Sequence, residues 1–230
     1  EIVDIDINEL VGLAEEPDRK WLEGLKLNPP NKPKFGKSIS GKDFSGSMDI
    51  YCAMKTLVER YGLAGVSLRC FDLLTALGNT GCMALAILNS QGVVATCEGD
   101  IPTLLSMCIA HQKFGISGFQ ANLSRIDGDK MLFAHCTVPL NMVEEYSYDT
   151  HFESGIGVAV HGVLPAGAAR IFKLSPDCSE MFLEDVEILE NQYNDCLCRT
   201  QILVDAPGLA DYFLRSPIGN HHVTIPERRQ

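Results

Sequence analysis

Two acidic side chains follow a short apolar segment near the middle of the chain. Glu98 and Asp100 come directly after residues 93–97, whose composition is typical of a strand buried on both faces of a parallel sheet. Ligands of open α/β sheets gather beyond the carboxyl ends of such strands. A carboxylate that leaves a buried strand needs a cation to offset its lost hydration, so Glu98 is a candidate metal ligand and catalytic base. Asp100 is a second catalytic candidate, although a helix N-cap is the more frequent reason for an acid at this position.

Histidines mark three later segments. His135 ends an apolar run, His151 lies two residues before Glu153 in an extended segment, and His221 and His222 enter the last predicted strand. Because neighbouring side chains of a strand point to opposite faces, only one residue of the final pair can enter a given site. Imidazoles among oxygen ligands favour manganese, magnesium or a similar divalent cation. His135, His151 and Glu153 are also substrate-binding candidates. A hydrogen-bonded structural histidine is the more frequent explanation of a residue such as His135, and a surface pair explains His151 with Glu153.

Polar residues alternate along residues 119–127, which read as a strand. Asn122 and Arg125 in this segment carry groups that could orient a polyol substrate. Ordinary alternation toward solvent accounts for the same pattern. Asn220, just before the paired histidines, is a further substrate-binding candidate.

The elements that must position these side chains change character near residue 115. Before it, helical periodicity in residues 50–61 and 82–88 alternates with strands at 66–68 and 93–97, and a proline-rich segment at 26–44 reads as a linker. After it, short strand-like runs separated by glycine, proline and aspartate predominate. The sequence therefore predicts an α/β protein with two domains. Residues 1–115 form part of a Rossmann-like parallel α/β domain, and residues 116–230 form a mainly antiparallel, β-barrel-like domain.

Composition narrows the class of partner. The 230 residues carry a formal net charge of −11 and a pI near 4.9, which argues against nucleic acids and anionic membranes as main partners. No apolar run approaches the roughly 20 residues that a membrane helix needs. Nine cysteines, an odd number, lie scattered in apolar segments, as reduced thiols do in a cytoplasmic protein. The composition is compatible with small polar molecules as ligands.

The opening residues indicate a piece of a longer protein. The chain begins with Glu1, and residues 2–7 read as a strand with nothing before it to pair with. We therefore expect a fragment.

Seven short segments, in this order along the chain, resemble the L-fucose and L-arabinose isomerase superfamily, especially its fucose isomerase-like members. The segments are residues 68–72, 97–102, 122–127, 134–137, 151–155, 198–201 and 219–222. The resemblance implies the C-terminal portion of a sugar isomerase: the end of a second α/β domain, then a β-barrel-like domain, in a homo-oligomer with active sites between subunits. It also implies little or no turnover from these residues alone, because a preceding domain would close over the sugar.

The resemblance further implies a divalent cation, usually Mn²⁺, held by two acidic residues and a histidine, and an aldose–ketose isomerisation through an enediol. Glu98 matches the first acidic ligand, and His221 or His222 matches the histidine. His135 looks similar to a histidine of the arabinose enzymes. The second acidic ligand falls at Asn122, whose amide oxygen can bind a hard cation but cannot take a proton.

The amide at this position keeps two alternatives open. One is a related epimerase or lyase that acts on a sugar or a sugar acid. The other is a carbohydrate-binding relative without catalysis.

Overall fold

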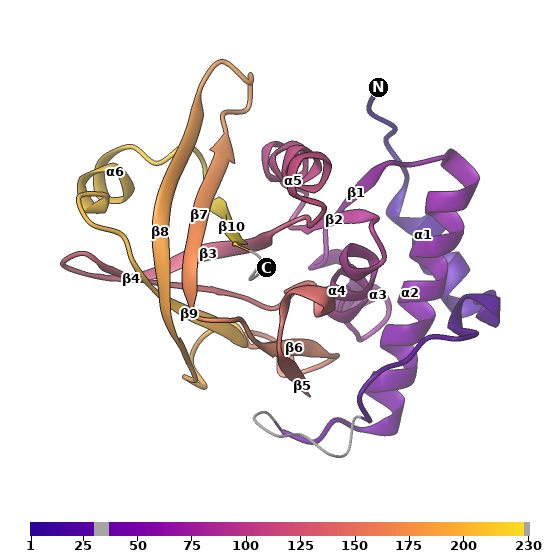
Figure 1. Ribbon diagram of the computed structural model, residues 1–230. Helices are drawn as coiled ribbons and strands as arrows, with labels where there is room; N and C mark the ends of the chain where they lie inside the picture. The colour runs from indigo at the N-terminus through magenta and orange to yellow at the C-terminus, as the bar shows by residue number, and fades with distance from the viewer. Residues whose placement is uncertain (30–36, 228–230) are drawn as a thin grey trace.

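The computed structural model describes residues 1–29 and 37–227. Figure 1 shows a helical part on one side and a strand-rich part on the other. The helical part contains α1 (Ile7–Glu15), the 3₁₀ turn η1 (Arg19–Leu22), α2 (Gly41–Tyr61), α3 (Asp72–Ala76) and α4 (Cys82–Ser90). Among the described residues, no helix is long and apolar enough to cross a membrane.

Two predictions for the N-terminal part are wrong, one as a whole and one in its bounds. Residues 1–6 form no strand, because Asp6 caps α1 by accepting a hydrogen bond from the backbone N–H of Asn8. Helix α2 begins at Gly41, inside the segment predicted as a linker, because Ser40 accepts a hydrogen bond from the backbone N–H of Asp43. Residues 30–36 of that predicted linker lie outside the described residues.

A β-α-β unit carries the first candidate residues. Strands β1 (Gly65–Leu68) and β2 (Val94–Cys97) pair in parallel, with α3 and α4 between them in the sequence. Every residue of β2 is buried, as its apolar composition predicts. The sequence predicts a Rossmann-like sheet, and the described residues form a parallel sheet of these two strands only.

The strand-rich part is a closed barrel of six antiparallel strands. Its order is β10-β3-β4-β9-β8-β7. The strands are β3 (Phe119–Asp127), β4 (Lys130–His135), β7 (Gly167–Leu174), β8 (Met181–Gln192), β9 (Thr200–Asp205) and β10 (His221–Pro226). Apolar side chains such as Phe119, Phe133 and Ile202 are fully buried in one core with Phe213 of α6 (Ala210–Arg215). The predicted β-barrel-like region is therefore confirmed.

Helix α5 (Ile101–Phe114) joins the two parts. It packs against β1 and β2 on one side and against β7 and β10 of the barrel on the other (Figure 1). Met107 and Ala110 of the helix share a core with Phe172 and Val223 of these barrel strands. This packing brings the carboxyl end of β2 close to the start of β10.

A separate hairpin completes the fold. Strands β5 (Glu145–Asp149) and β6 (Ala159–Val163) pair in antiparallel fashion after the 3₁₀ turn η2 (Leu140–Met142). Strand β6 contacts α4 and β9. The loop between β5 and β6 carries two of the candidate residues, His151 and Glu153.

Candidate metal centre

The turn between β2 and α5 is shaped to present an acidic side chain. Glu98 and Gly99 have φ angles of 65° and 68°, so both adopt the left-handed conformation. This conformation costs a residue with a Cβ roughly 1–2 kcal/mol, and unfavourable backbone of this kind concentrates at functional sites. Glu98 is therefore held in an unfavourable conformation directly after a fully buried strand.

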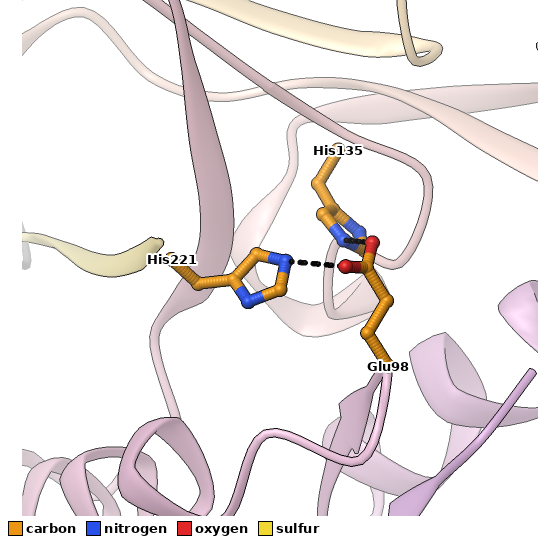
Figure 2. A group of neighbouring side chains, drawn as sticks. All are labelled: Glu98, His135 and His221. Atoms are coloured by element: carbon orange, nitrogen blue, oxygen red, sulfur yellow. Dashed lines mark ion pairs between the residues drawn. The ribbon is translucent and has the colours of Figure 1, made fainter. Parts of the chain in front are cut away.

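Three side chains from distant parts of the sequence meet at this turn. Figure 2 shows Glu98 between His135, the last residue of β4, and His221, the first residue of β10. The Nε2 atom of His135 lies 3.6 Å from Oε1 of Glu98, and Nε2 of His221 lies 3.4 Å from Oε2. The potential ligand atoms of all three residues lie within 4.8 Å of one another. The side chain of Glu98 is 32% exposed and those of the histidines at most 4%, so the cluster opens to solvent on the carboxylate side.

The two imidazoles determine the electrostatics of Glu98. The nearby imidazole of His135, and then that of His221, holds the pKa of the Glu98 carboxyl well below its ordinary value. Burial works to lower the pKa of His221, but Asp100 and Glu98 outweigh it and raise the pKa overall. Glu98 is therefore an ionised carboxylate near neutral pH, which is the form that binds a cation.

Asp100 lies behind His221 rather than in the open part of the cluster. It caps α5 by accepting hydrogen bonds from the backbone N–H of Thr103 at 2.8 Å and from its hydroxyl at 2.6 Å. It also contacts Nδ1 of His221 at 2.8 Å and the ammonium of Lys173 at 3.3 Å. Burial works to raise the pKa of Asp100, but the contacts with His221, Thr103 and Lys173 outweigh it and lower the pKa overall.

The amide of Asn122 points toward the same region. Asn122 on β3 is directly opposite His221 on β10, and directly opposed residues of an antiparallel pair place their side chains on the same face, about 5 Å apart. Its Oδ1 is buried and has no hydrogen-bond partner, and the same is true of Nε2 of His221. Two buried polar atoms without a hydrogen-bond partner beside a carboxylate fit a bound divalent cation. The donor set therefore fits the metal that the sequence predicts.

His222 lies on the other face of β10. Its Nε2 is 2.9 Å from the hydroxyl of Tyr212, and its ring packs edge-on against Phe213 and Phe182 in the barrel interior. Burial lowers the pKa of His222 to about 4. Of the two adjacent histidines predicted as metal ligands, only His221 belongs to the cluster with Glu98.

The remaining predicted substrate residues lie in four places. The Nδ1 atom of His151 contacts the hydroxyl of Ser154, and its ring packs edge-on against Phe71, just after β1. Arg125 is exposed and donates to Gln192, and Glu153 and Asn220 are exposed as well. Neither His151 nor Glu153 belongs to the cluster of possible metal ligands around Glu98.

Sequence reasoning missed two features of the site. His135 was predicted as a substrate-binding residue, and the structure brings it within ligand distance of the other members of the cluster. Lys173 was not predicted at all, although a lysine within the apolar run of residues 171–174 is an unusual residue for a buried strand. Its side chain is 1% exposed.

Comparison with known proteins agrees with the sugar-isomerase resemblance. No model of a known protein family matches the chain. The chain is similar to sulfoquinovose isomerases. It is 28% identical to one from a Clostridium species over 153 residues, covering 60% of this chain and 33% of the relative. It is 27% identical to those of Priestia aryabhattai and Priestia megaterium over 183 residues, covering 76% of this chain and 38% of each relative. The chain thus spans about a third of the length of these curated relatives.

Proposed function

We propose that the protein is a divalent-metal-dependent aldose–ketose isomerase that converts its sugar through an enediol. One observation carries this proposal. Glu98, His135 and His221 come from three separate elements, yet their potential ligand atoms lie within 4.8 Å of one another. The relatives named sulfoquinovose isomerase support the same reaction class. We therefore propose sulfoquinovose, a sugar with a sulfonate group, as the first substrate to test.

The residues proposed to hold the cation are Glu98, His221 and Asn122, with His135 on the opposite side of the Glu98 carboxylate. Carboxylate, amide oxygen and imidazole together suit Mn²⁺ or a similar cation, as the sequence predicts. When bound, such a cation polarises the oxygens next to the reacting carbons and makes the C2 proton easier to remove.

Proton transfer is assigned to Glu98 together with His135. Isomerisation moves a proton from C2 of the aldose to C1 and the hydroxyl proton of O2 to O1, and the electron pair passes through the enediol. Histidine is the side chain that most often performs such transfers. The Nδ1 atom of His135 is 2.9 Å from the hydroxyl of Thr137, which leaves its Nε2 facing Glu98. The family resemblance places a second acidic residue at position 122, but the Asn122 amide cannot exchange a proton in this chemistry. In this proposal, Glu98 and His135 together take over that proton transfer.

For Asp100 we propose a role other than the catalytic one that the sequence predicts. Both of its carboxylate oxygens already accept hydrogen bonds from Thr103 and contact Lys173. We therefore propose that Asp100 acts through His221 and does not contact the substrate.

The test is an isomerisation assay in D₂O followed by NMR. We expect Mn²⁺-dependent incorporation of deuterium at C2 together with ketose formation, and neither in the Glu98→Gln variant, which keeps the shape of the side chain. Exchange at C2 is measured because it reports the first half of the reaction even where turnover is low. Deuterium at C2 without ketose would instead establish an epimerase. Sugar binding that is insensitive to EDTA, with no exchange at any protein concentration, would establish a carbohydrate-binding protein.

A cytoplasmic homo-oligomer is part of the same proposal. It rests on the resemblance, which implies active sites between subunits, and on the cysteine usage. The open side of the cluster, where Glu98 is 32% exposed, is where we propose that the sugar and a second subunit would approach. Sedimentation analysis of the protein tests the oligomer directly.

A further inference from the structure

The carboxylate of Asp100 faces a group that must act as a hydrogen-bond donor. Its Oδ2 atom is 2.8 Å from Nδ1 of His221. An ionised carboxylate only accepts hydrogen bonds, so the proton of this contact belongs to Nδ1. A neutral imidazole carries one N–H, and Nε2 of His221 is then an unprotonated acceptor.

The other ring nitrogen of His221 faces a second acceptor. Nε2 lies 3.4 Å from Oε2 of Glu98 and has no hydrogen-bond partner. Two acceptors at this distance repel each other unless a cation or a proton lies between them. The orientation that Asp100 imposes on His221 therefore creates a position for a cation beside Glu98.

Lys173 connects Asp100 to the turn that leads into β10. Its ammonium lies 3.4 and 3.3 Å from the two carboxylate oxygens of Asp100 and donates to the hydroxyl of Thr103 at 2.5 Å. On its other side it lies against Gly219, where an added Cβ would be 3.2 Å from Cε of Lys173. Gly219 also has a φ of 72°, which favours glycine. Lys173 thus contacts Asp100, the residue that orients His221, and lies close to Gly219, two residues before His221.

From these contacts we infer that Asp100 and Lys173 are positioning residues: they hold His221 in the tautomer protonated at Nδ1 and aim its Nε2 at the cation position beside Glu98. This role rests on the proposed metal centre. A carboxylate that accepts from the second nitrogen of a metal-binding histidine fixes the ring and makes it a stronger ligand. Lys173 supplies the counter-charge that allows Asp100 to remain ionised in a buried position.

The tautomer can be measured in the metal-free protein without any substitution. Long-range ¹⁵N–¹H correlation spectra of protein labelled at histidine distinguish Nδ1–H from Nε2–H. The spectra are recorded at a pH where the ring is neutral, and the His221→Gln spectrum assigns the signal. We expect His221 to be protonated at Nδ1. A signal for Nε2–H, or an equal mixture of both forms, would overturn the inference.

Metal affinity gives the second readout, with Mn²⁺ as the probe and paramagnetic resonance to count the free ion. Asp100→Asn preserves the helix cap, because asparagine caps as well as aspartate does. Lys173→Met removes the counter-charge but keeps the apolar stem. We expect each change to weaken Mn²⁺ binding by about 10- to 100-fold, the range for residues that support a metal ligand. The control is Arg170→Met on the same strand, whose partners Asp185 and Glu227 are exposed.

The two measurements separate failure of the inference from failure of the proposed function. If the wild-type protein binds no Mn²⁺, the proposed metal centre fails, and the tautomer still tests the role of Asp100. If the wild-type protein binds Mn²⁺ and both variants stay within threefold of it, the metal centre stands and the positioning role is wrong.

Discussion

The two faces of strand β10 hold adjacent histidines in opposite environments. On the outer face, His221 is enclosed by the carboxylates of Glu98 and Asp100, which raise its pKa. On the inner face, His222 lies among the aromatic rings of the barrel, and burial lowers its pKa to about 4. Both side chains are buried, at 2% and 1% exposure. Burial alone therefore does not determine what a histidine does, because the charge of its neighbours determines which form is stable.

The comparison suggests a division of roles within one strand. On the outer face, Oδ1 of Asn122 and Nε2 of His221 are buried without hydrogen-bond partners, and Nε2 lies 3.4 Å from the Glu98 carboxylate, an arrangement that a bound cation would relieve. The inner face carries closely packed rings, which stabilise the barrel. Changes on the inner face should therefore alter stability and leave metal binding intact, and changes on the outer face should do the reverse.

The largest effect is expected from the inner face. Phe213→Ala removes a ring that packs against Phe133, Phe182 and His222. Deleting a buried phenylalanine costs about 3–5 kcal/mol through lost burial and the cavity left behind. We expect urea unfolding to show this loss, with Mn²⁺ affinity of the folded protein unchanged. A parallel loss of Mn²⁺ affinity would show that the two faces are coupled.

The next effect distinguishes the adjacent histidines. His221→Gln should weaken Mn²⁺ binding by at least about 100-fold, because it removes a ligand and not merely a supporting residue. His222→Gln is the matched control. It should lower the free energy of unfolding by about 1 kcal/mol through the lost contact with Tyr212, and leave Mn²⁺ affinity unchanged. Calorimetric titration with Mn²⁺ measures both affinities, and equal effects would contradict the assignment.

A smaller effect of opposite sign is expected at Asn122. Asn122→Asp adds a charged ligand on the outer face, and ligand charge increases cation affinity. We expect Mn²⁺ to bind about tenfold more tightly. Without metal the added carboxylate should lower stability, because it would lie near Glu98 without a counter-charge. Relative to wild type, the midpoint temperature of thermal unfolding of the variant should therefore rise with Mn²⁺ and fall without it. The same change under both conditions would exclude Asn122 from the site.

The smallest effect concerns a buried histidine that belongs to neither face. His161 on β6 stacks on Tyr193 with ring centroids 5.0 Å apart, and burial lowers its pKa below 6.5. Its folded pKa is below the unfolded value, so the unfolded chain binds more protons as the pH falls below about 6.5. The contribution of His161 to the free energy of unfolding is therefore present above about pH 6.5 and is lost as the pH falls below it. Comparing the pH dependence of unfolding in wild type and His161→Gln tests this, and identical curves would contradict it.

Much of the fold follows from local pattern in the sequence. The apolar run before Glu98 forms a fully buried strand, Asp100 caps the next helix, and the alternating segments beyond residue 115 form strands. These features depend on residues a few positions apart, which sequence periodicity reports directly. The opening residues are the exception: alternation predicted a strand there, but among the described residues no strand pairs with them, and the cap at Asp6 begins a helix.

Which distant residues meet was decided only by the tertiary structure. Closure of the barrel places Asn122 opposite His221, and packing of α5 against the barrel brings Glu98 beside His135 and His221. The sequence shows that only one of His221 and His222 can face a given site. The pairing register of β10 with β3 determines that His221 is the one that faces Glu98. The sequence marks Lys173 as an unusual residue for a buried strand, but only the tertiary structure shows its partner Asp100, which lies 73 positions away in the sequence and makes the buried charge tolerable.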